Sequence, residues 1–140
     1  MKRSSIMACV VLTGLLSGCV TQSRTPVHHK AQGALGPYSG SVEAGGLIFV
    51  SGKIGQRGGA FDLEVETTLD AVESELTRLG ATFDDVVQAT VFLTDLDNYA
   101  RFNEIYGRRM GDPYPARACV EVSRLPGEAR VEVQVIALKP

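Results

Sequence analysis

Apolar residues recur along most of the chain in patterns that predict alternating strands and helices. Residues 47–50 form a short apolar run between glycines, which is typical of a buried strand after a turn. Residues 62–79 carry apolar side chains at helical spacing, so they predict a helix that Gly80 ends. The apolar positions are Val65, Leu69, Val72, Leu76 and Leu79, and the acidic positions, expected mostly to point outward, are Glu64, Glu66, Asp70, Glu73 and Glu75.

A further strand and a second helix follow. Residues 86–93 are rich in Val, Thr and Phe, which favours a strand, and the two acidic residues before them suit a turn or a cap. The next helix is expected to have Asp97 as its cap and to stop at Gly111. Its apolar stripe contains Tyr99, Phe102 and Tyr106.

Two strands, residues 116–123 and 130–138, are expected to close the chain after a turn at Pro126-Gly127, giving the order strand, strand, helix, strand, helix, strand, strand. Alternation places Arg117, Cys119 and Glu121 on one face of the first, and Glu132 and Gln134 on one face of the second. We expect these polar residues to share one sheet face, which a neighbouring subunit covers, while the helices cover the other. From the pattern alone, a solvated surface ion pair of Arg117 with Glu132 is an equally good interpretation.

The first 33 residues differ from the rest. Lys2 and Arg3 precede an apolar run, and the junction Leu16-Ser17-Gly18-Cys19 resembles a bacterial lipobox. We therefore expect a signal peptide over residues 1–18 and acylation of Cys19; an ordinary leader with an incidental cysteine is the alternative. Val20 after the cysteine resembles outer-membrane sorting, so the expected location is the cell envelope, lipid-anchored on the periplasmic side, or the periplasm if Cys19 carries no lipid.

Residues 19–33 are polar and aperiodic, which predicts a flexible tether, and one folded domain should occupy residues 34–140. Adjacent His28 and His29 are weak evidence for a metal site. The net charge of −2 and sequence pI of 5.7 argue against a nucleic-acid partner. The domain has no phosphate loop, dinucleotide fingerprint or ligand cluster, so neither a metal nor an organic cofactor is expected.

A series of motifs from about Leu35 to the C-terminus resembles the signatures of the Rid/YjgF family. They are Leu35-Gly36-Pro37-Tyr38-Ser39, Phe49-Val50-Ser51-Gly52, residues 91–96 and 102–106, Pro115-Ala116-Arg117-Ala118-Cys119-Val120-Glu121-Val122, Leu125-Pro126 and residues 131–137. The resemblance implies an α+β, chorismate-mutase-like fold: a mixed sheet with two helices on one face, assembling as a homotrimer with clefts between subunits. It also implies hydrolytic deamination of small reactive enamines and imines, such as 2-aminoacrylate, to 2-keto acids and ammonia.

The same resemblance implies roles for the matching residues. Arg117 would anchor the substrate carboxylate with a bidentate pair of hydrogen bonds, and Glu132 would polarise the attacking water. The expected substrate-binding positions are Tyr38, Ser51, Gly52, Arg117, Ala118 and Cys119, with Cys119 as a wall of the pocket and not a nucleophile. Asn103 and Tyr106 also match, although a structural role suits them better; Asn103 is a candidate for the cleft rim.

Lys53 departs from the family pattern, because active members usually carry Gln there, and the loop after it is short. Its ammonium could attract anionic substrates at the cleft rim or point to solvent. Two other functions stay open: a non-catalytic module that binds small carboxylates, and a chaperone-like protein of the envelope. The presence of both Arg117 and Glu132 favours the enzyme.

Overall fold

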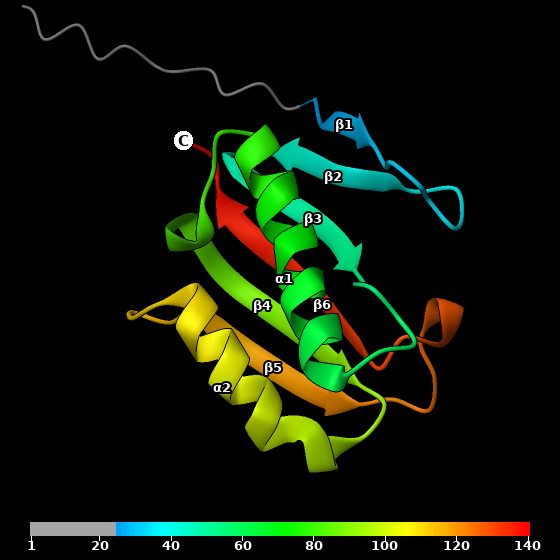
Figure 1. Ribbon diagram of the computed structural model, residues 1–140. Helices are drawn as coiled ribbons and strands as arrows, with labels where there is room; N and C mark the ends of the chain where they lie inside the picture. Colours follow the sequence, from blue (N-terminus) through cyan, green and yellow to red (C-terminus); the bar gives the residue numbers. More distant parts are fainter. Residues whose placement is uncertain (1–24) are drawn as a thin grey trace, which may run out of the picture.

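The computed structural model describes residues 25–140 as one six-stranded sheet with two helices on one face (Figure 1). The elements are β1 Val27–Lys30, β2 Ser39–Ala44, β3 Leu47–Lys53, α1 Phe61–Arg78, η1 Phe83–Asp85, β4 Val86–Leu93, η2 Leu96–Asn98, α2 Tyr99–Met110, β5 Ala116–Glu121, η3 Pro126–Glu128 and β6 Val131–Leu138. The strand order is β1-β2-β3-β6-β4-β5, and only β4 and β5 pair in parallel. The predicted mixed-sheet fold is confirmed.

The register of the sheet decides which side chains face the helices. Paired residues on neighbouring strands point to the same face, and the row of Val50, Val135 and Ala89 is buried beneath the helices. No helix of residues 25–140 covers the opposite face, which we call the open face (Figure 1). By register it carries Val42, Leu47, Phe49, Thr90, Phe92, Ala118, Val120, Glu132, Gln134, Ile136 and Leu138.

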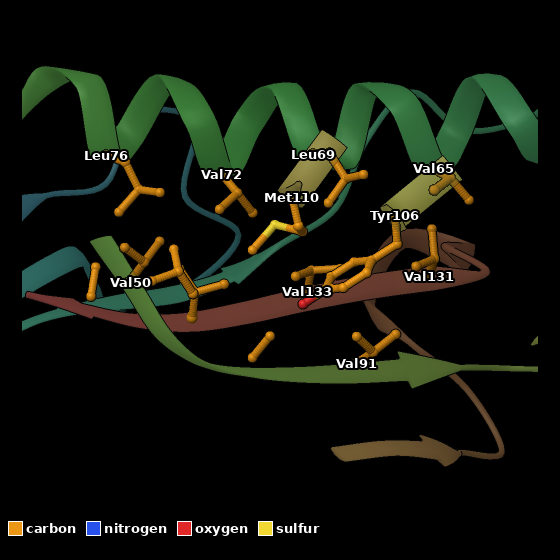
Figure 2. Close-up of a cluster of buried hydrophobic side chains, with 14 of the residues drawn as sticks. Val50, Val65, Leu69, Val72, Leu76, Val91, Tyr106, Met110, Val131 and Val133 are labelled. Atoms are coloured by element: carbon orange, nitrogen blue, oxygen red, sulfur yellow. The ribbon is translucent and has the colours of Figure 1, made fainter. Parts of the chain in front are cut away.

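The core lies between α1 and the sheet. Four of the five apolar positions predicted from helical spacing are buried, and Figure 2 shows them directed at valines of β3, β4 and β6: Val65, Leu69, Val72 and Leu76. Leu79, which follows the last residue of α1, is only partly buried against the core. Met110 and Tyr106 of α2 extend the same cluster. The helix ends where it was expected to, because Gly80 takes a φ of +80° that favours glycine. No helix of the described chain is long and apolar enough to cross a membrane.

Glu64 does not point outward as expected. Its side chain is 1% exposed and accepts hydrogen bonds from the backbone N–H of Arg130 at 2.6 Å and from Arg130 Nε at 2.7 Å. The position borders the apolar stripe of α1, so the carboxylate is buried where the chain enters β6. Its pairing with a guanidinium explains how a charge is accommodated there.

The start of α2 also corrects an expectation. Asp97 lies in the η2 turn and does not cap the helix, which begins at Tyr99 without a side-chain cap. The N–H of Asp97 instead donates to the side chain of Asp95 at 2.9 Å, so the acidic residues here stabilise a turn before the helix. Gly111 ends α2 as predicted.

Strand β1 lies within the stretch that was expected to be a tether. Val27–Lys30 pair antiparallel with β2, and Nε2 of His29 lies 2.7 Å from Oε1 of Glu43. The strand is at the sheet edge with mostly exposed side chains, so it lacks the apolar alternation that reveals strands in a sequence. The tether prediction is therefore wrong for residues 27–30. The predicted signal peptide and Cys19 lie outside the described residues.

Candidate active site

Arg117 and Glu132, the residues expected to be catalytic, lie on opposite faces of the sheet. Arg117 pairs in register with buried Ala89 and faces the helices, whereas Glu132 pairs with Phe92 on the open face. The expectation that Arg117, Cys119 and Glu132 share a face is wrong. The polar residues of β5 resembled a solvent face, but Arg117 of this edge strand is turned toward polar groups of α2.

Neutral groups of α2 hold the guanidinium of Arg117. Its Nη2 donates to Asn103 Oδ1 at 2.7 Å and to the hydroxyl of Tyr99 at 3.3 Å, and its carbon Cζ lies 4.6 Å from the ring centroid of Tyr106. No carboxylate in residues 25–140 forms an ion pair with it. Arg117 is thus fixed in position with its charge available to an anion. We call Arg117, Asn103, Tyr99 and Tyr106 the arginine platform.

Cys119 and Ala118 point in opposite directions beside the platform. Cys119 packs against the core, and burial raises the pKa of its thiol although the charge of Arg117 lowers it in part. The raised pKa leaves the thiol protonated near neutral pH, which makes it a poor nucleophile. Ala118 pairs with Thr90 on the open face. Of the two, only Cys119 shares a face with Arg117.

Glu132 lies against the backbone of β3. An ideal Cβ on Gly52 would stand 1.8 Å from its Oε1, so the carboxylate occupies space that only a glycine leaves open. Within residues 25–140 no group donates a hydrogen bond to this carboxylate or pairs with it. Burial raises the pKa of Glu132. The ionised group is therefore a stronger base than an ordinary glutamate.

Glu132 lines a cavity of about 620 Å³ between the loop of residues 31–38, the end of β3 and one side of α1. We call it the Glu132 cavity. Four other expected site residues line it, namely Tyr38, Ser51, Gly52 and Lys53. The other four expected residues, Ala118, Cys119, Asn103 and Arg117, do not line it. One chain therefore holds two separate groups of candidate site residues.

The polar residues at the end of β3 are anchored in different ways. Ser51 Oγ donates to the carbonyl oxygen of Ser39 at 2.7 Å, while the ring of Tyr38 is half exposed. Lys53 is directed at α1, where its Nζ lies 3.3 Å from Oε2 of Glu75. Burial raises the pKa of Glu75, but hydrogen bonds from Ser41, Arg78 and Lys53 lower it overall. Lys53 therefore lines the cavity as a member of this ion-pair network, and its ammonium does not point to solvent.

Sequence reasoning missed two features of these groups. Tyr99 was expected only in an apolar stripe, although Tyr99, Asn103 and Tyr106 are spaced four and three residues apart and therefore share a helix face. That spacing was a usable signal for the platform. Arg57, which also lines the Glu132 cavity, comes from a loop whose folding no local pattern predicts.

The histidines of β1 do not form a metal site with their neighbours. His29 pairs with Glu43, and Nδ1 of His28 lies 3.3 Å from the hydroxyl of Ser39. In the described part of the chain, no group of three His, Cys, Asp or Glu side chains is placed to hold a metal ion.

The part of the chain that resembles known proteins includes both the arginine platform and the Glu132 cavity. A family model described as Endoribonuclease L-PSP matches residues 28–139. A RutC family protein of Pyrococcus abyssi is 38% identical over 117 residues, which is 79% of this chain and 92% of that protein. The protein named "Putative reactive intermediate deaminase TdcF" of Escherichia coli K12 is 33% identical over 119 residues, which is 79% of this chain and 92% of that protein.

Solved structures agree with these matches. RidA from an Antarctic Psychrobacter superposes with a TM-score of 0.73 at 33% identity, covering 78% of this chain and 94% of that one. A YjgF-family protein of Neisseria meningitidis gives a TM-score of 0.75 at 29% identity, covering 84% of this chain and 97% of that one.

Proposed function

The chain belongs to the Rid/YjgF/L-PSP family, and on that premise we propose that it hydrolyses small reactive imines and enamines of amino acids to 2-keto acids and ammonia. One observation carries the proposal. The chain presents a fixed arginine with no carboxylate partner in residues 25–140 and, separately, a half-buried carboxylate with a raised pKa. The first suits the carboxylate of an amino-acid derivative, and the second suits a base that activates water.

A cleft that uses both groups must take them from two subunits, because they lie on opposite faces of one sheet. The open face supports such an assembly: its apolar side chains Phe49, Val120 and Leu138 are 38%, 43% and 51% exposed. An uncovered apolar face is typical of a subunit interface. We therefore propose a homotrimer in which the arginine platform of one subunit meets the Glu132 cavity of the next.

The proposed reaction adds water to a carbon–nitrogen double bond. The guanidinium of Arg117 holds the substrate carboxylate, and Glu132 accepts a proton from water as the water oxygen bonds to the imine carbon. Glu132 then returns this proton to nitrogen, which gives a carbinolamine. Transfer of the hydroxyl proton to nitrogen lets the carbon–nitrogen bond break as the carbonyl forms, and ammonia leaves the 2-keto acid. An enamine such as 2-aminoacrylate first gains a proton at its methylene carbon and loses one from nitrogen, and thereby becomes the imine.

The other expected residues would shape the cleft. Gly52 makes room for the carboxylate of Glu132, and Asn103 keeps the guanidinium of Arg117 in place. Tyr38 and Ser51 would border the substrate from the cavity side. Cys119 would form an apolar wall, since its protonated thiol has no histidine base within the described hydrogen bonds.

Other functions are less well supported. RNA cleavage, which the family description suggests, needs basic groups for phosphates, but the chain is acidic overall and most arginines in residues 25–140 already pair with carboxylates. A non-catalytic carboxylate-binding module would need Arg117 but not a half-buried carboxylate with a raised pKa, as Glu132 has. A chaperone-like role would depend on neither.

The test is an imine hydrolysis assay on the purified protein. An amino-acid oxidase forms 2-iminopropanoate from alanine, and semicarbazide traps the imine that remains. We expect the protein to lower semicarbazone formation at catalytic concentration, and Glu132→Gln to reduce the rate about 10²–10⁴-fold while still binding pyruvate. Binding with no turnover in the parent protein would favour the carboxylate-binding module. Neither binding nor turnover would favour the chaperone-like role.

We also propose that the protein is a lipoprotein of the cell envelope, anchored through Cys19 with its domain in the periplasm. The lipobox supports this proposal. Cys19→Ser should move the protein out of the membrane fraction or leave an uncleaved precursor, as judged by fractionation and intact mass. A parent protein that is soluble and carries no lipid would refute it.

A further inference from the structure

Arg57 differs from most arginines of the structure. Of the eight arginines in residues 25–140, five pair with carboxylates: Arg78, Arg101, Arg108, Arg109 and Arg130. The others are Arg57, Arg117 and Arg124. Among these three, only Arg57 and Arg117 are held by hydrogen bonds to neutral groups. Arg57 thus combines a hydrogen-bonded guanidinium with a charge that no described carboxylate compensates, as Arg117 does.

Gly127 holds Arg57 in place. Nη1 of Arg57 donates to the carbonyl oxygen of Gly127 at 3.0 Å. An ideal Cβ on Gly127 would stand 1.9 Å from that same nitrogen, so any side chain at this position would displace the guanidinium. The φ of Gly127 is +62°, which favours glycine in any case. A guanidinium carries five N–H donors, so most of those on Arg57 stay available to an anion.

Arg57 and Glu132 line the same cavity. The cavity's other cationic residues, Lys53 and Arg78, both pair with Glu75. The acidic residue of η3, Glu128, forms no ion pair with Arg57. Within the described residues, Arg57 is therefore the cation of this cavity that no carboxylate neutralises.

We propose that Arg57 binds a second carboxylate on the substrate, so that the preferred substrates are imino acids derived from aspartate or glutamate. The inference rests on the proposed function and refines it. Arg117 from the adjacent subunit would hold the carboxylate next to the imine carbon, and Arg57 would hold the one on the substrate side chain. The reaction is unchanged: a 2-imino dicarboxylate and water give a 2-keto dicarboxylate and ammonia.

The test compares two imines on the full-length protein. Oxidases generate 2-iminopropanoate from alanine and 2-iminosuccinate or 2-iminoglutarate from the acidic amino acids, with semicarbazide as the trap. We expect kcat/KM to be at least about tenfold higher for a dicarboxylic imine. Arg57→Gln should lower that value about 10- to 100-fold and leave the monocarboxylic value within about twofold. Arg57→Lys should lie between, because it keeps the charge but loses the planar fork.

Arg124→Gln is the matched control, since Arg124 has no carboxylate partner among the described residues and does not line the cavity; it should change neither rate. Equal rates for both imines in the parent protein would overturn the inference and leave the proposed function intact. Loss of both activities in Arg57→Gln, with the fold retained, would assign Arg57 a general role and also overturn it. If no imine is hydrolysed, the proposed function fails. Calorimetry then tests Arg57 by comparing the affinities for 2-oxoglutarate and pyruvate: an affinity at least about tenfold higher for 2-oxoglutarate would support the inference, and equal affinities would overturn it.

Discussion

Mixed oligomers can test whether Arg117 and Glu132 act from different subunits. Arg117→Ala removes the anchor, and Glu132→Gln removes the base, so each variant alone should be nearly inactive. Co-expression of the two variants with different affinity tags, followed by purification on both tags, yields only oligomers that contain both kinds of subunit. The placement of the two residues on opposite sheet faces predicts that such oligomers recover activity.

The size of the recovery follows from ring geometry. A closed ring of three subunits has three junctions, and each pairs Arg117 of one subunit with Glu132 of the next. Whether a mixed ring holds one or two Arg117→Ala subunits, one junction joins an intact Arg117 to an intact Glu132. Each mixed trimer should therefore have roughly one third of the parent activity. A cleft built within one subunit would give no recovery.

The assay is imine hydrolysis by the doubly purified trimers, with oligomeric mass measured by light scattering. The control replaces Glu132→Gln by the double variant Arg117→Ala/Glu132→Gln, which cannot restore any junction. The shared cleft would be refuted if mixed trimers of confirmed mass were no more active than Arg117→Ala or Glu132→Gln alone. Recovery near one half would indicate a dimer in place of the trimer, because a mixed dimer restores one of two junctions.

The raised pKa of Glu132 predicts that kcat/KM falls as the pH drops through that pKa, so the acidic limb of the pH profile should lie above the ordinary glutamate value of about 4.3; a limb at the ordinary value would contradict the burial argument. Gly52→Ala should lower kcat by at least about tenfold with the fold retained by circular dichroism, because the new methyl would stand 1.8 Å from Oε1 of Glu132. Leu69→Ala should lower the free energy of unfolding by about 2–5 kcal/mol in urea titration, because its side chain is fully buried; a smaller loss would mean that the core closes around the gap.

The sequence predicted the helices and inner strands well because their burial imposes a period on the apolar residues. Val65, Leu69 and Val72 recur along one side of α1, and they are buried in the structure. Strand β1 has no such period, because it is an edge strand whose side chains are mostly exposed. Glu64 was misplaced because its partner, Arg130, lies 66 residues away and no local pattern reports it.

The two halves of the candidate site differ in what a sequence can reveal about them. The family motifs identified Arg117 and Glu132, but not their faces, which depend on the parallel pairing of β5 with β4. The tertiary structure determines that pairing. Period-two alternation shows which residues of β5 share a face, but not whether that face is the one covered by the helices. The position of Arg57 depends on Gly127, 70 residues further along the chain, so only the folded structure brings Arg57 to the Glu132 cavity.

Because β1 already begins at Val27, the link between Cys19 and the folded domain is short, which would limit how the protein can be oriented on a membrane. If Cys19 carries lipid, only residues 20–26 separate it from the sheet, and seven extended residues reach at most about 25 Å. In a threefold ring the three links leave from one side, at equal heights. Three short links would hold the ring upright, with its axis along the membrane normal. Each cleft would then sit at a fixed height above the lipid, open to metabolites that diffuse through the periplasm.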